Sequence, residues 1–73
     1  MRHNVIFEAI PESLYDLNKA LMLGEIQTEW ESVTYSRKGL LVAVADEQAA
    51  FDLLDEVTGD FIDPTAVDTR IVT

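Results

Sequence analysis

The 73-residue chain contains no cysteine, one histidine, two prolines and three glycines, and its basic residues are few. The missing cysteine excludes disulfides, thiolate zinc sites and cysteine nucleophiles, and it agrees with a reducing cytoplasm. The glycines stand alone at positions 24, 39 and 59, so neither a P-loop nor a dinucleotide-binding glycine cluster is present. The chain also lacks the alternating acids of an EF-hand and a nucleophile–histidine relay. We therefore expect no enzyme, no cofactor and no dedicated metal site.

Long hydrophobic runs are absent as well. The longest, at residues 40–45, is far too short to cross a bilayer, and residues 1–8 contain no apolar stretch of the kind found in signal peptides. A chain of this length forms one domain, residues 1–73, and 48% hydrophobic residues is a globular composition. We expect a single cytoplasmic domain that makes no contact with membranes.

Acidic residues are what the chain has in excess, with 14 Asp and Glu against 5 Lys and Arg and a net charge of −9. The imbalance is strongest between Gly39 and Thr69, where there are eight acids and no base. Such a charge argues against nucleic acid and anionic membrane as direct partners. It favours a basic protein surface, cations or a saline solvent. The eight acids are Asp46, Glu47, Asp52, Asp55, Glu56, Asp60, Asp63 and Asp68.

Hydrophobic periodicity predicts four strands and two helices in the order β-α-β-β-α-β. Pro11 is expected to open the first helix, and Asp46 to cap the second, which Gly59 would end. Two apolar stripes are expected to be buried, one at Ile10, Leu14, Leu17 and Leu21 and one at Ala50, Leu54 and Val57. The predicted strands are residues 5–9, 28–36, 40–45 and 66–72, the first helix is residues 11–23, and residues 60–65 form a loop.

This order predicts an α+β fold, namely a two-layer sandwich of the ferredoxin-like type. Two helices would cover one face of a four-stranded antiparallel sheet, with the first and third strands in its centre. An irregular α+β arrangement of the same elements is the alternative. The uncovered face should show Ile6, Val33, Leu41, Ala43 and Tyr35, which makes it a candidate surface for a homodimer.

The predicted second helix carries three acids on one face. Asp52, Asp55 and Glu56 lie three or four residues apart, which places their Cβ atoms roughly 5–6 Å from one another. Like charges at this spacing cost a helix a few tenths of a kcal/mol per pair, and no base stands four residues away to relieve them. Because folding gains nothing from such a face, we predict that it binds a partner. Around it we expect Glu47, Asp60 and Asp63, with Glu29 and Glu31 of the second strand as an extension.

Two interpretations of these acids belong to different functional classes. In the first, the carboxylates imitate a line of phosphates and occupy the basic groove of a nucleic-acid-binding protein, with a long-range, salt-screened attraction. In the second, the protein is a small cytoplasmic domain or regulatory subunit of a halophile, and its acids only hold water. Glu29 and Glu31 would then simply keep an edge strand from pairing with other chains.

Small size, the lack of cysteine, a compact α/β plan and the acidic stretch from Asp46 to Asp63 resemble the phage-encoded anti-CRISPR proteins that block type I effector complexes. The resemblance implies binding to the Cascade complex in the cytoplasm of the host cell. It also implies a strategy, in which acids occupy the positive residues that would otherwise contact target DNA. The members of this group share no common motif, so the resemblance assigns no individual contact.

Overall fold

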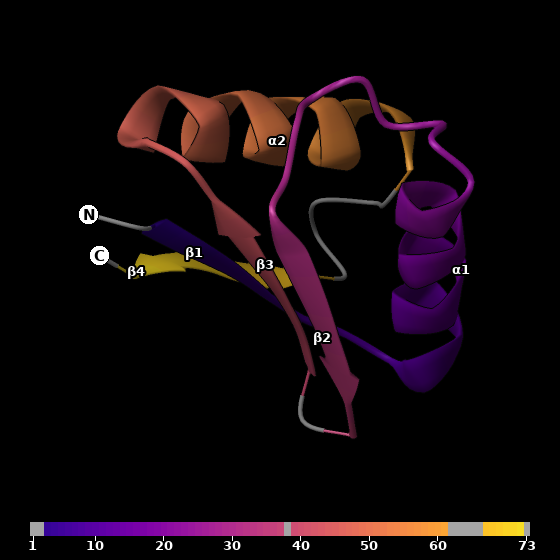
Figure 1. Cartoon of the computed structure of the whole chain (residues 1–73). Helices are drawn as coiled ribbons and strands as arrows, with labels where there is room; N and C mark the ends of the chain where they lie inside the picture. The colour runs from indigo at the N-terminus through magenta and orange to yellow at the C-terminus, as the bar shows by residue number, and fades with distance from the viewer. Residues whose placement is uncertain (1–2, 38, 62–66, 73) are drawn as a thin grey trace.

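A computed structural model describes residues 3–37, 39–61 and 67–72 of the chain (Figure 1). The order of the elements is the predicted β-α-β-β-α-β. The elements are β1 (His3–Glu8), α1 (Pro11–Met22), β2 (Ser32–Ser36), β3 (Gly39–Val44), α2 (Glu47–Asp60) and β4 (Asp68–Val72).

The four strands form one sheet in the order β2-β3-β1-β4, and every neighbouring pair is antiparallel. The two most apolar strands, β1 and β3, are therefore central, and the more polar β2 and β4 lie at the edges. Both helices lie over the same side of this sheet, with α1 beside β2 and β3 and α2 across β1 and β3 (Figure 1). This arrangement confirms the predicted α+β fold, a ferredoxin-like sandwich.

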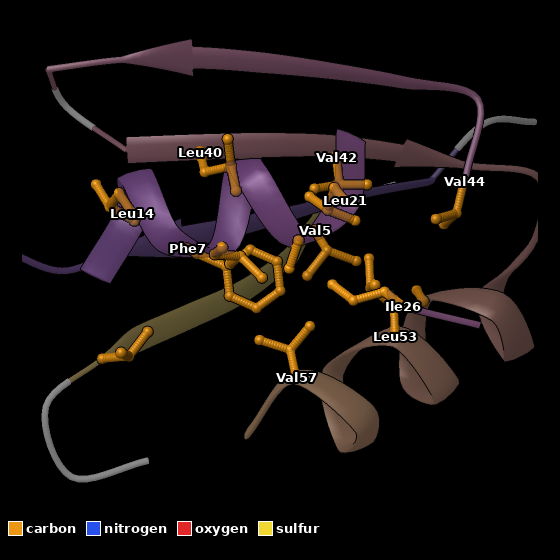
Figure 2. Packing of buried hydrophobic residues seen from close by; sticks show 14 residues of the cluster. Val5, Phe7, Leu14, Leu21, Ile26, Leu40, Val42, Val44, Leu53 and Val57 are labelled. Atoms are coloured by element: carbon orange, nitrogen blue, oxygen red, sulfur yellow. The ribbon is translucent and has the colours of Figure 1, made fainter. Parts of the chain in front are cut away.

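The core fills the space between the sheet and the two helices (Figure 2). Alternate residues of β1 and β3 point into it, because successive side chains of a strand project to opposite faces. Leu14, Leu17 and Leu21 of α1 close the core from one side, as predicted. The strand residues in the core are Val5, Phe7, Leu40, Val42 and Val44, and each is fully buried.

The ends of α1 follow from its capping residues. Pro11 occupies the first turn as predicted, but Ile10 before it is 61% exposed and does not belong to the buried stripe. Ile10 is the N-cap of the helix and has extended backbone angles. Its side chain therefore does not follow the helical spacing that places Leu14, Leu17 and Leu21 on one face. At the other end, Gly24 (φ +75°) donates to the carbonyl of Leu21, and Glu25 donates to that of Ala20. These two bonds form a Schellman motif, in which glycine takes the left-handed position.

The buried stripe of α2 differs from the predicted one by one residue. Ala50, Leu53 and Val57 are completely buried, whereas Leu54 is only partly covered. The helix also continues past Gly59 and ends with Asp60, so Asp60 is not in a loop. A glycine inside a helix lowers its stability by up to about 1 kcal/mol, a cost that tertiary packing can override.

The turn between β2 and β3 decides which side chains face the helices. The predicted strands, residues 28–36 and 40–45, leave three residues for this turn, but Gly39 belongs to β3 and pairs with Ser36. Val33 consequently stands opposite Val42, and Tyr35 opposite Leu40. Since directly opposite residues share a face, Val33 and Tyr35 lie on the helix side of the sheet. The prediction that they lie on the uncovered face is wrong, because a one-residue change of register turns every side chain over.

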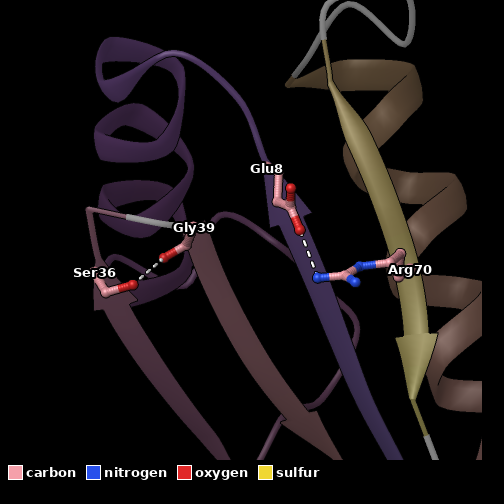
Figure 3. A network of polar contacts seen from close by, with 4 residues as sticks. All are labelled: Glu8, Ser36, Gly39 and Arg70. Atoms are coloured by element: carbon pink, nitrogen blue, oxygen red, sulfur yellow. Dashed lines mark hydrogen bonds and ion pairs between the residues drawn. The ribbon is translucent and has the colours of Figure 1, made fainter.

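The uncovered face of the sheet is accordingly more polar than expected. Ser32, Thr34 and Ser36 of β2 lie on it, and an ion pair joins Glu8 of β1 to Arg70 of β4 (Figure 3). Ile6 and Leu41 on this face are half-buried, and the small side chain of Ala43 is almost covered. The homodimer through this face stays a prediction, and it has lost two of the five residues on which it was based.

Candidate functional site

The candidate site is built on α2, and the start of this helix is fixed by Asp46. Asp46 has extended backbone angles, and its side chain accepts a 2.8 Å hydrogen bond from the backbone N–H of Ala49. This bond satisfies one of the N–H groups that the first turn leaves without a helical partner. Glu47 follows in the first turn, where a negative charge suits the positive end of the helix dipole. The predicted N-cap is therefore present.

Asp52 and Asp55 lie on the solvent side of α2, and both are exposed. The amide of Gln48, one turn earlier, donates a 3.0 Å hydrogen bond to Asp52. The side chain of Asp55 has no such partner among the described residues. The last turn of α2 contains no basic residue to offset these charges. The two aspartates form the predicted acidic row without any cation from their own helix.

A second wall faces this row. The connection between α1 and β2 passes beside α2 (Figure 1), and Gln27, Thr28 and Glu29 line a shallow depression together with residues of the helix. We call this depression the acidic groove. Its other lining residues are Asp46, Gln48, Ala49, Asp52, Asp55 and Glu56, so five of its nine residues are acids and none is a base.

Glu56 ties the two walls together. Its carboxylate accepts hydrogen bonds from the backbone N–H of Gln27 (2.7 Å), the backbone N–H of Thr28 (3.0 Å) and the hydroxyl of Thr28 (2.7 Å). Partial burial by itself would raise the pKa of Glu56, but the bonds from Gln27 and Thr28 outweigh it, so the pKa is lowered from its ordinary value of 4.5. Glu56 thus stays ionised as an internal anchor.

This anchoring corrects two expectations. Glu56 is not a carboxylate that folding leaves unused, since both of its oxygens hold the α1–β2 connection. The second strand also begins at Ser32 rather than Thr28, because the N–H groups of Gln27 and Thr28 bond to Glu56 instead of a neighbouring strand. Glu29 and Glu31 therefore lie before the edge strand, although the N–H of Glu31 still bonds to the carbonyl of Ala43.

The predicted site residues divide into three groups. Glu29, Asp52, Asp55 and Glu56 come together in the acidic groove. Glu31 and Glu47 are exposed but do not line it. Asp63 and the side chain of Asp60 lie outside the described part of the chain.

Two features of the groove were not predicted. Asp46 lines it in addition to capping the helix, and Gln27 with Thr28 supplies the donors that hold Glu56. Nothing in a single sequence marks Thr28 as a partner of Glu56, because the two residues are 28 positions apart. The position of Asp46 could have been inferred, since a residue at the start of α2 lies near the acids one to two turns later.

The groove is lined by carboxylates, two side-chain amides, a hydroxyl and one alanine. It has no histidine, and His3 lies in β1 opposite Val44. No three His, Asp or Glu side chains within residues 3–37, 39–61 and 67–72 come together as a metal site. In the same ranges, no helix is long and apolar enough to cross a membrane. What the groove offers is negative charge on two walls that the hydrogen bonds of Glu56 hold together.

Comparisons with protein families, curated proteins and solved structures give no match to this chain.

Proposed function

We propose that this protein is a non-enzymatic inhibitor that binds the basic, nucleic-acid-binding surface of another protein and keeps DNA from it. The observation that carries the proposal is the base-free acidic groove, in which two separate segments of the chain contribute acids. Glu29 from the α1–β2 connection lies across from Asp52 and Asp55 of α2. Lys and Arg side chains that normally contact phosphates would find carboxylates on both sides.

The geometry of the groove supports specificity as well as attraction. Capping by Asp46 and anchoring by Glu56 hold the backbones of both walls, so the partner would bind to acids whose backbone positions are already set. Binding to a preorganised site avoids part of the entropic cost of ordering flexible side chains and loops. The attraction should act over about 10 Å at 0.1 M salt and weaken as salt rises.

A narrower proposal concerns the partner. The resemblance to anti-CRISPR proteins of phages leads us to propose a type I effector complex, Cascade, in the host cytoplasm. Its support is the small size, the lack of cysteine and the acidic stretch from Asp46 to Asp63. In this proposal the acidic groove occupies the basic residues of the complex that hold target DNA.

The experiment is a displacement assay. Fluorescently labelled double-stranded target DNA is bound to Cascade at about 50 mM KCl, and the protein is titrated in while anisotropy is recorded. The narrower proposal predicts a fall in anisotropy that shifts to higher protein concentration as KCl is raised. Unchanged anisotropy at saturating protein would eliminate Cascade as the partner.

A second candidate function has an observation of its own. Exposed acids also occur on elements that do not line the groove, at Glu12 and Asp16 on α1 and at Asp68 on β4. This spread favours the alternative of a halophile domain or regulatory subunit whose acids only retain water. Thermal melts against KCl separate the two candidates. A protein that folds only above molar salt belongs to the alternative, whereas one that folds in dilute buffer agrees with the inhibitor.

A further inference from the structure

Two tyrosines lie exposed in a hollow at the opposite end of the molecule from α2. Tyr15 of α1 is 58% exposed and Tyr35 of β2 is 44% exposed. The hollow lies between the first turns of α1 and the end of β2. Figure 1 shows these two segments at the lower end of the molecule. Its lining residues are Pro11, Glu12, Tyr15, Asp16 and Tyr35, and we call it the tyrosine hollow.

The chemistry of this hollow combines aromatic rings with carboxylates. Glu12 and Asp16 are four residues apart on α1 and therefore lie on the same side of the helix as one another. Both are exposed, and neither forms an ion pair within the described part of the chain. Tyrosine rings attract cations through their negative faces, and carboxylates attract them by charge. The two attractions reinforce each other only for a cationic group.

We infer that the tyrosine hollow binds an arginine side chain of a partner protein. A guanidinium group suits it better than an ammonium group, because it is planar, stacks on aromatic rings and presents several donors to carboxylates. Pro11 adds apolar surface for the stem of the side chain. This surface is separate from the acidic groove and does not depend on the proposed function.

Two other occupants are less suitable. A second copy of this chain would bring its own net charge of −9 close to Glu12 and Asp16, and it is less favourable in this hollow than a basic partner. The chain's own Arg37 lines the adjoining hollow beside Tyr35, Pro11 and Leu14, but it makes no ion pair with Glu12 or Asp16 in the described residues. Among the described residues, no cation is ion-paired in the tyrosine hollow.

The test is an NMR titration of the intact protein with the tripeptide Ac-Ala-Arg-Ala-NH2. We expect saturable shifts of the Tyr15 and Tyr35 ring signals with a Kd of roughly millimolar order, as befits a single side chain. The matched peptide with citrulline, which keeps the shape of arginine but not its charge, should bind at least about tenfold more weakly. Equal binding of both peptides, or no ring shifts, overturns the inference.

Two variants complete the experiment. Glu12→Gln combined with Asp16→Asn changes only exposed side chains and should weaken binding at least about fivefold. Asp52→Asn combined with Asp55→Asn removes charge from the acidic groove and should leave the ring shifts unchanged. If the groove variant abolishes the ring shifts and the hollow variant does not, the arginine binds in the groove and the inference is wrong.

Discussion

Glu56 and Thr28 are joined twice, through the backbone N–H and the hydroxyl of Thr28, although one residue lies on α2 and the other follows α1. A third bond from the N–H of Gln27 completes the contact. The carboxylate of Glu56 therefore has two roles: it holds the second wall of the acidic groove in place, and it contributes to the negative charge of the groove.

Replacing Glu56 by Gln should lower the free energy of unfolding by about 1–2 kcal/mol, because a charged acceptor of three hydrogen bonds becomes a neutral one. Urea denaturation measures this difference. The matched control is Asp55→Asn on the same helix, whose side chain has no hydrogen-bond partner among the described residues. It should change stability by less than about 0.5 kcal/mol. Equal effects of the two substitutions would show that Glu56 is not an anchor.

The anchor also predicts a pH dependence. Since the pKa of Glu56 is lower in the folded protein than its ordinary value of 4.5, its stabilisation is complete above about pH 4.5 and is lost as pH falls through the folded value. The stability difference between wild type and Glu56→Gln should therefore be constant near neutrality and narrow in acid. Taking this difference cancels the titration of the other acids. A gap that stays constant down to pH 3 would rule out a lowered pKa.

Gly39 should tolerate no side chain. A Cβ atom at this position would lie 2.6 Å from the carbonyl oxygen of Phe7, and the backbone has a φ of +156°. Gly39→Ala should destabilise the protein by about 2 kcal/mol or more, since backbone has to move. Gly59→Ala is the control, because no atom lies within 4 Å of its Cβ position inside α2. It should stabilise the protein by roughly 0.5–1 kcal/mol. Thermal denaturation of both variants shows whether each substitution lowers or raises the stability of the protein.

Most of the fold could be predicted because local signals and the global arrangement agree. Pro11, Asp46 and the uninterrupted apolar β3 each indicate an element by simple chemistry, and the order of the elements then restricts the topology. What could not be predicted depends on pairing between distant segments. The side of the sheet on which Tyr35 lies depends on whether the turn between β2 and β3 has two or three residues. The two-residue alternation of side chains along a strand is the same in both cases and cannot decide this.

The same distinction holds for the acidic groove. Helical spacing predicted the side-by-side acids Asp52 and Asp55, since helix geometry is local. It could not predict that Glu56, four residues after Asp52, turns to the α1–β2 connection. Nor could it show that Glu29 lies there outside any strand. Both facts come from a tertiary contact. Glu56 was predicted to contact the partner, but its carboxylate instead holds the α1–β2 connection against α2.

We propose that charge at the acidic groove, and not the overall net charge, binds the partner. The measurement is displacement of labelled DNA from Cascade by two variants with the same change in net charge. Asp52→Lys with Asp55→Lys alters the groove, and Glu25→Lys with Asp68→Lys alters exposed acids that do not line it. Both must first show wild-type circular dichroism and melting. We predict that the groove variant loses displacement by at least about tenfold, and that the control stays within about threefold of wild type. Equal losses in the two variants, or none in the groove variant, would show that the acidic groove is not the binding surface.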